Sequence, residues 1–178
     1  MTDHFDREIA ESRFRDVFSH LGAVTAYARR RGSRDADGVA AEVMTIAWRR
    51  LADVPSDDPL PWLYATARNL LLAESRRSGR RTLLREPDTH VPPLEAQALD
   101  PQLERALGAL RPLDREALLL IAWEDLTPVQ AARTLGLSPT AFRVRLLRAR
   151  RRLRTNLEAA EADARRPSHL VHPDVEGA

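Results

Sequence analysis

Seven arginines and no acidic residue lie between residues 143 and 154, and a second acid-free cluster of five arginines spans residues 76–85. Guanidinium groups attract phosphate by charge and can grip a guanine edge with two hydrogen bonds, so both clusters could bind nucleic acid. Outside the clusters, 26 acidic residues stand against 16 arginines. Two basic clusters on an otherwise acidic chain indicate two contact sites on one polyanion.

The C-terminal cluster follows the sequence signals of a helix-turn-helix. Thr127 is a candidate helix N-cap before Pro128, and Gln130 would complete a capping box. Gly136 suits the left-handed end of that helix. A second helix is expected from Pro139 after a three-residue turn, which is the geometry that places a recognition helix in the DNA major groove.

Helical spacing divides this second helix into two faces. The stripe expected to be buried consists of Phe142, Leu146, Ala149 and Leu153. Outward and flanking positions would reach base edges and phosphates. The residues predicted to contact DNA are Thr140, Arg143, Val144, Arg145, Leu147, Arg148 and Arg151. The alternative is a solvated basic helix that aids solubility, but the caps, the turn and the buried stripe together favour DNA docking.

The elements that carry these clusters are all predicted to be helices, because no run alternates apolar and polar residues in the manner of a strand. We expect helices over 14–31, 35–51, 59/61–77, 101–110, 114–124, 128–135 and 139–156. The fold class is therefore all-α, with two small helical domains joined by a flexible linker. The expected order is an N-terminal tail (1–13), a helical domain (14–81), a linker (82–100), a helix-turn-helix domain (101–157) and a C-terminal tail (158–178).

Composition argues against several other classes of protein. The absence of cysteine excludes disulfides, thiolate metal sites and cysteine catalysis. The five histidines lie mostly in the expected tails and linker, and there is no glycine-rich phosphate loop, so we expect no enzyme, metal or cofactor. A metal at His169 and His172 is the weak alternative. We also expect a cytoplasmic protein without membrane insertion, since there is no long apolar run and no signal-peptide pattern.

Three segments in order carry a family resemblance: AEVMTIAWRRL (41–51), YATARNLLLAESRR (64–77) and the helix-turn-helix that ends in RLLRARRRL. Together they resemble the extracytoplasmic-function sigma factors, the two-domain group of bacterial RNA polymerase specificity subunits. The resemblance covers about residues 14–157. It implies a sigma factor that binds core RNA polymerase and opens promoter DNA, with region 2 at the −10 element and region 4 at the −35 element. Many members are held inactive by an anti-sigma factor, which is therefore a further candidate partner.

The resemblance implies that the helix over 35–51 binds the largest polymerase subunit. The wheel of this helix leaves an exposed strip, from which the predicted polymerase contacts are Ala41, Glu42, Thr45 and Arg49. Glu42 falls where the family has its glutamate, so we expect it to contact polymerase. The alternative role of Glu42 is that of an ordinary solvated acid. Trp48 is expected in the core.

The resemblance also implies that the next helix and its preceding loop, ADVPSDDP (52–59), capture an unstacked base at the −10 element. Asn69 matches the family's asparagine and could read a base edge, because an amide both donates and accepts hydrogen bonds. The alternative to base reading is that Asn69 is a helix-surface residue without a special role. The predicted DNA contacts are Asn69, Arg76, Arg77, Arg80 and Arg81. Trp62 could stack on a base, but a core position is favoured.

The sequence departs from the family pattern at a few positions, namely Ala41, Met44, Ala73 and Val144. Valine cannot hydrogen-bond a base but can touch a thymine methyl group. The resemblance therefore does not fix which promoter sequence the chain would recognise. The main alternative function is a free-standing helix-turn-helix regulator. Such a regulator usually needs a dimer interface, and we find no surplus apolar stripe for one.

Overall fold

The computed structural model describes residues 2–82 and 100–164, with side chains from 7 to 77 and from 100 to 162. Within these ranges every regular element is helical, as expected for an all-α protein. The first half contains α1 (Thr2–Phe18), α2 (Leu21–Arg30), α3 (Ala36–Arg49), a short 3-10 helix η1 (Leu51–Asp53) and α4 (Leu60–Thr82). The second half contains α5 (Pro101–Gly108), α6 (Pro112–Ala122), α7 (Pro128–Leu135) and α8 (Pro139–Ala164).

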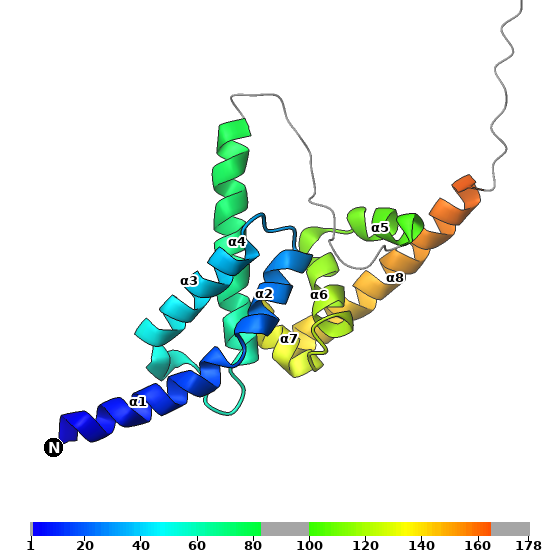
Figure 1. Ribbon diagram of the computed structural model, residues 1–178. Coiled ribbons are helices and arrows are strands. Elements are labelled where there is room, and N and C mark those ends of the chain that lie inside the picture. The colour runs from blue at the N-terminus through cyan, green and yellow to red at the C-terminus, as the bar shows by residue number, and fades with distance from the viewer. Residues whose placement is uncertain (1, 83–99, 165–178) are drawn as a thin grey trace, which may run out of the picture.

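In the N-terminal half, α2, α3 and α4 pack around a common core. Tyr27 from α2, Val43 from α3 and Leu63 from α4 are fully buried in it. α1 packs mainly along α3, and its N-terminal part projects away from the remaining helices (Figure 1). The N-terminal domain is therefore a three-helix core with one additional helix on its side.

The N-terminal segment differs from the sequence prediction. One continuous helix over 14–31 was expected after a tail (1–13), but α1 already begins at Thr2 and ends before a break at Ser19 and His20. The Ser19 hydroxyl donates to the Asp16 carbonyl oxygen at 2.6 Å, a local bond that competes with helix continuation. An ion pair between Arg7 and Glu11, one turn apart, supports the helix in the expected tail.

In the C-terminal half, α5, α6 and α7 pack against the first part of α8. Phe142 and Ala149 of α8 are fully buried there. α8 continues to Ala164, past its expected end at 156, through a run of good helix formers. The first residues of the expected C-terminal tail (158–178) are thus helical. Most of the predicted linker (83–99) and the rest of the tail (165–178) lie outside the described residues.

The two halves pack against each other. α7 lies on α4, and a single buried cluster contains side chains from both halves, including Tyr64 and Phe142. Figure 1 shows α2 and α4 beside α6 and α7 at this junction. Sequence reasoning did not anticipate this contact.

Candidate nucleic-acid interface

The turn between α7 and α8 is built as the sequence predicted. Thr127 and Gln130 form both hydrogen bonds of the capping box. The backbone amide of Gln130 donates to the Thr127 hydroxyl at 3.3 Å, and the backbone amide of Thr127 donates to the side-chain oxygen of Gln130 at 2.9 Å. Gly136 ends α7 in the left-handed conformation, with φ at 65°. The Ser138 hydroxyl then accepts a hydrogen bond from the Ala141 amide at 3.2 Å and caps α8. The helix-turn-helix geometry is confirmed.

The two faces of α8 also match the prediction. Phe142, Leu146 and Ala149 are buried, and Leu153 is half-buried. On the outward side Leu147 is 71% exposed. The other predicted contacts that are exposed on α8 are Thr140, Arg143, Val144, Arg148 and Arg151.

Arg145 is held differently from the other predicted contacts. Its guanidinium donates to the carboxylate of Asp114 at 2.7 Å, and Arg152 binds the other oxygen of the same carboxylate. Asp114 lies on α6 and is almost completely buried, so this double ion pair fixes α8 against α6. Arg145 therefore orients α8 against α6.

A shallow groove continues from the recognition face toward the end of α8. It is lined by Arg148, Arg151, Arg152, Thr155 and Asn156. Three guanidinium groups and a hydroxyl offer donors to an anion such as a backbone phosphate. Sequence reasoning missed Thr155 and Asn156, although their spacing from Arg148 and Arg152 puts them on neighbouring turns of the helix.

On α4, three residues spaced by seven positions lie along one side of the helix: Trp62, Asn69 and Arg76. Asn69, Arg76 and Arg77 are exposed. Trp62 is half-buried against the core, as favoured from the sequence, and the Arg50 guanidinium lies 5.9 Å from its ring centre. The side chains of Arg80 and Arg81 lie outside the described ones, although α4 reaches Thr82.

The loop over 52–59 leads into α4 and is anchored on the N-terminal domain. Val54 is buried, and its carbonyl oxygen accepts a hydrogen bond from Arg13 of α1. The candidate −10 loop is thus held at one end by the core. At its other end, Asp58 faces α7 of the second half.

The predicted polymerase contacts on α3 form a continuous exposed strip. Ala41, Glu42, Thr45 and Arg49 are all exposed, and the Thr45 hydroxyl bonds back to the Ala41 carbonyl oxygen at 2.9 Å. Trp48 is 46% exposed, so its expected core position is wrong. Trp48 packs beside the core instead, where the Phe14 ring of α1 meets it edge-on at 5.0 Å.

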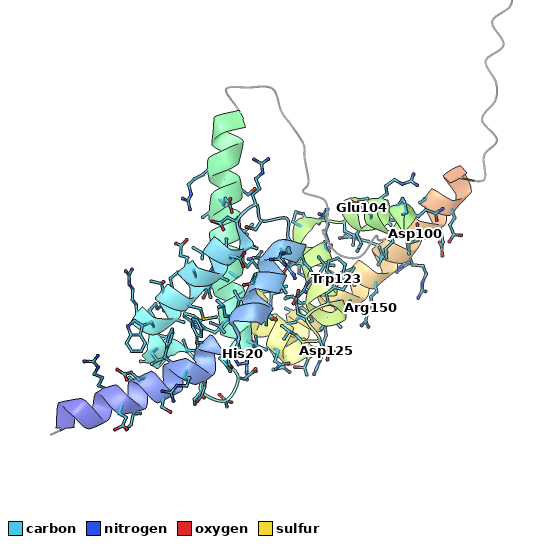
Figure 2. All side chains as sticks on the ribbon, viewed as in Figure 1. His20, Asp100, Glu104, Trp123, Asp125 and Arg150 are labelled. Atoms are coloured by element: carbon cyan, nitrogen blue, oxygen red, sulfur yellow. The ribbon has the colours of Figure 1, made fainter. Side chains whose placement is uncertain are left out.

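The described residues contain no group of three potential metal ligands. None of the helices in the described ranges is both long and apolar enough to cross a bilayer. The turn between α6 and α7 is the one place there where a residue other than glycine has a positive φ, at Asp125 (51°). Figure 2 labels Trp123 and Asp125 in this turn; between them in sequence lies Glu124, whose side chain is turned inward.

Comparison with known proteins agrees with this geometry. The family description "Sigma-70 region 2" matches residues 17–81, and "Sigma-70, region 4" matches residues 101–153. The chain belongs to the sigma-70 family, in the two-region form of the extracytoplasmic-function group. The family resemblance seen in the sequence is therefore confirmed.

Individual relatives point the same way. The probable RNA polymerase sigma factor RfaY of Xanthomonas campestris pv. campestris is 37% identical over 135 residues, which are 68% of this chain and 34% of RfaY. The chain thus spans about a third of the length of this curated relative.

Two solved structures share the fold. One is the sigma factor RpoE in complex with the anti-sigma factor NepR from Bartonella quintana, with a TM-score of 0.60 and 24% identity, covering 81% of this chain and 95% of RpoE. The other is CnrH in complex with the cytosolic domain of CnrY, with a TM-score of 0.58 and 28% identity, covering 86% of this chain and 97% of CnrH.

Proposed function

We propose that this chain is a sigma factor that binds core RNA polymerase and directs promoter recognition and DNA opening for transcription initiation. The observation that carries the proposal is that one chain contains region 2 followed by region 4 and presents three separate exposed surfaces on them. These surfaces are the strip on α3, the Asn69 side of α4 and the outward face of α8. A free-standing regulator would need only the last of them.

Each surface is assigned one task in this proposal. Domain 14–81 binds polymerase through Ala41, Glu42, Thr45 and Arg49, and the −10 element through Asn69, Arg76, Arg77, Arg80 and Arg81. Domain 101–157 binds the −35 element through α8. The tether between the domains raises the effective concentration of the second domain once the first is bound. The chain itself is a binding subunit without catalytic chemistry, and it acts in the cytoplasm, where polymerase transcribes.

An anti-sigma factor is the further partner that we propose. The support is that RpoE was solved with the anti-sigma factor NepR, and that CnrH was solved with the cytosolic domain of CnrY.

Gel filtration of the chain mixed with bacterial core RNA polymerase tests the proposal. We expect the chain to co-elute with polymerase. If the chain elutes alone yet binds duplex DNA tightly without polymerase, the free-standing regulator replaces the sigma factor.

A further inference from the structure

Two apolar side chains stand in the middle of the outward face of α8. Val144 is 44% exposed and Leu147 is 71% exposed. They are three positions apart, so they are neighbours on the helix surface. Among the large apolar side chains that the structure describes, Leu147 has the highest exposed fraction. We name Val144 and Leu147 the apolar pair.

Exposed arginines border the apolar pair. By helical spacing, Arg143 lies on one flank of the pair and Arg148 on the other. Arg151 follows one turn beyond Leu147 and is also exposed. A protein that covered the pair would have to remove these guanidinium groups from water, whereas a DNA duplex meets them with phosphates. The charge around the pair therefore favours DNA as its occupant.

The fold holds the apolar pair in this outward position. On the other side of α8, Phe142 and Ala149 are fully buried, and α5, α6 and α7 pack against the helix. The ion pair between Arg145 and Asp114, at 2.7 Å, also restrains rotation of α8 about its axis. The pair therefore cannot turn inward while the domain keeps its fold.

Aliphatic side chains in the major groove favour one base. Thymine alone presents a methyl group there, whereas the other bases present only hydrogen-bond donors and acceptors. A valine or leucine has no polar atom, so it leaves those donors and acceptors unpaired when it covers them. It gains instead by burying a methyl group. Each member of the apolar pair thus selects thymine.

The spacing within the apolar pair fits two successive thymines. Side chains three positions apart on a helix have Cβ atoms about 5–6 Å apart. Successive bases of one strand rise by about 3.4 Å, and the twist of the duplex sets their major-groove methyl groups roughly 5 Å apart. One side chain can therefore cover each methyl group without bending of α8 or of the duplex.

We propose that Val144 and Leu147 read two successive thymines on one strand of the −35 element through apolar contact with their methyl groups. This inference rests on the part of the proposed function that assigns α8 to the −35 element, and it does not depend on polymerase binding. Arg143 and Arg148 then lie over the neighbouring base pairs or phosphates. The apolar pair thereby sets a base preference that arginines alone would not give.

Selection from random duplexes, followed by removal of single methyl groups, tests this readout. The full chain, alone and mixed with core polymerase, is incubated at low salt with duplexes that carry a random core of about 12 base pairs. We expect two successive thymines in the enriched motif. Deoxyuridine then replaces each thymine in turn, which removes the methyl group and keeps the base pairing. Each replacement should weaken binding about threefold to fourfold, as the burial of one methyl group implies.

Alanine variants assign each thymine to one side chain. Val144→Ala should lose the sensitivity to deoxyuridine at one position, and Leu147→Ala should lose it at the other. Each variant should keep the sensitivity at the remaining position. Leu72→Ala is the matched control, because Leu72 is an exposed leucine of α4, outside the helix-turn-helix domain. The control should keep both sensitivities, and circular dichroism checks that all variants keep their helix content.

Three results would overturn the readout. They are a motif without successive thymines in both samples, an affinity of the unchanged chain that deoxyuridine leaves unaltered, and alanine variants that keep both sensitivities. The last result would leave the apolar pair as a surface for a protein. If the chain fails to co-elute with core polymerase but shows the methyl dependence, the proposed sigma function fails while the readout stands. Co-elution without methyl dependence is the reverse case, so the two failures are distinguishable.

Discussion

Arg145 of α8 donates a hydrogen bond at 2.7 Å to the buried carboxylate of Asp114 on α6. The contact joins the helix that we assign to the −35 element to the rest of its domain. Arg148, on the outward face of the same helix, is exposed. Arginines of one helix thus divide into those that orient it and those that face outward.

Arg145→Ala should destabilise the chain. Asp114 keeps Arg152 as a partner, so we expect a loss of about 1–2 kcal/mol in the free energy of unfolding rather than the full cost of an unpaired buried charge. Urea denaturation followed by circular dichroism measures the loss. Stability equal to that of the unchanged chain would show that the Asp114 contact carries no energy.

Arg148→Ala should weaken binding of the −35 element by about 1–3 kcal/mol if the side chain grips a base, while stability stays the same. Arg150→Ala is the matched control, since it removes the same charge from the same helix, on the opposite flank of the outward face. We expect a smaller loss for Arg150→Ala, uniform across DNA sequences. Equal losses for both variants on every sequence would remove Arg148 from base readout.

Glu42→Lys should lower the affinity for core polymerase by about tenfold, because charge reversal in an interface places like charges together. DNA binding by the full chain should not fall. Glu158→Lys makes the same change at an exposed position of α8 and should leave polymerase affinity unaltered. Competition for polymerase between labelled and unlabelled chain gives the affinities. Identical affinities for the two variants would place Glu42 outside the interface.

Asn69→Ala should slow promoter opening more than it weakens the initial closed complex, because the amide is assigned to an unstacked base. Permanganate reactivity of unpaired thymines reports opening, and a gel shift reports closed binding. Ser75→Ala, another exposed position on α4, is the control for helix content. A matching loss at both steps would contradict the role given to Asn69.

Both tyrosines of the chain lie at the junction and should titrate abnormally. Burial, followed by the Glu116 carboxylate, raises the pKa of Tyr27 well above its ordinary value. Burial, followed by the Glu124 carboxylate, raises the pKa of Tyr64 to about 12. The neutral phenols are favoured in the folded chain, so their stabilisation is complete below about pH 10 and is lost as the pH rises toward 12.

An alkaline absorbance titration measures these two phenols. In Glu116→Gln/Glu124→Gln both should ionise closer to pH 10, because the carboxylates are gone. Glu11→Gln, which removes an exposed carboxylate of α1, is the control and should titrate like the unchanged chain. Unaltered midpoints in the double variant would mean that burial alone raises the two pKa values.

The sequence was most informative where structure depends on neighbours in the chain. Thr127, Gln130 and Gly136 act within a few residues of one another, so the helix-turn-helix could be predicted in detail. The exposed strip on α3 followed from helical periodicity alone. Trp48 was misplaced because its exposure depends on how α1 packs beside α3, a tertiary contact that helical periodicity does not specify.

The junction between the halves could not be predicted in this way. Arg31 and Glu116 are 85 residues apart, and each looks in sequence like an ordinary solvated side chain. Only the docking of two domains turns them into buried partners.

The most direct measurement of the central claim is run-off transcription with purified core polymerase on a library of genomic fragments. If the chain is a sigma factor, its addition yields discrete transcripts whose start sites share a −10 and a −35 motif, and Arg148→Ala reduces them. If core polymerase with the chain produces the same transcripts as core polymerase alone, the chain does not direct initiation and the account is wrong.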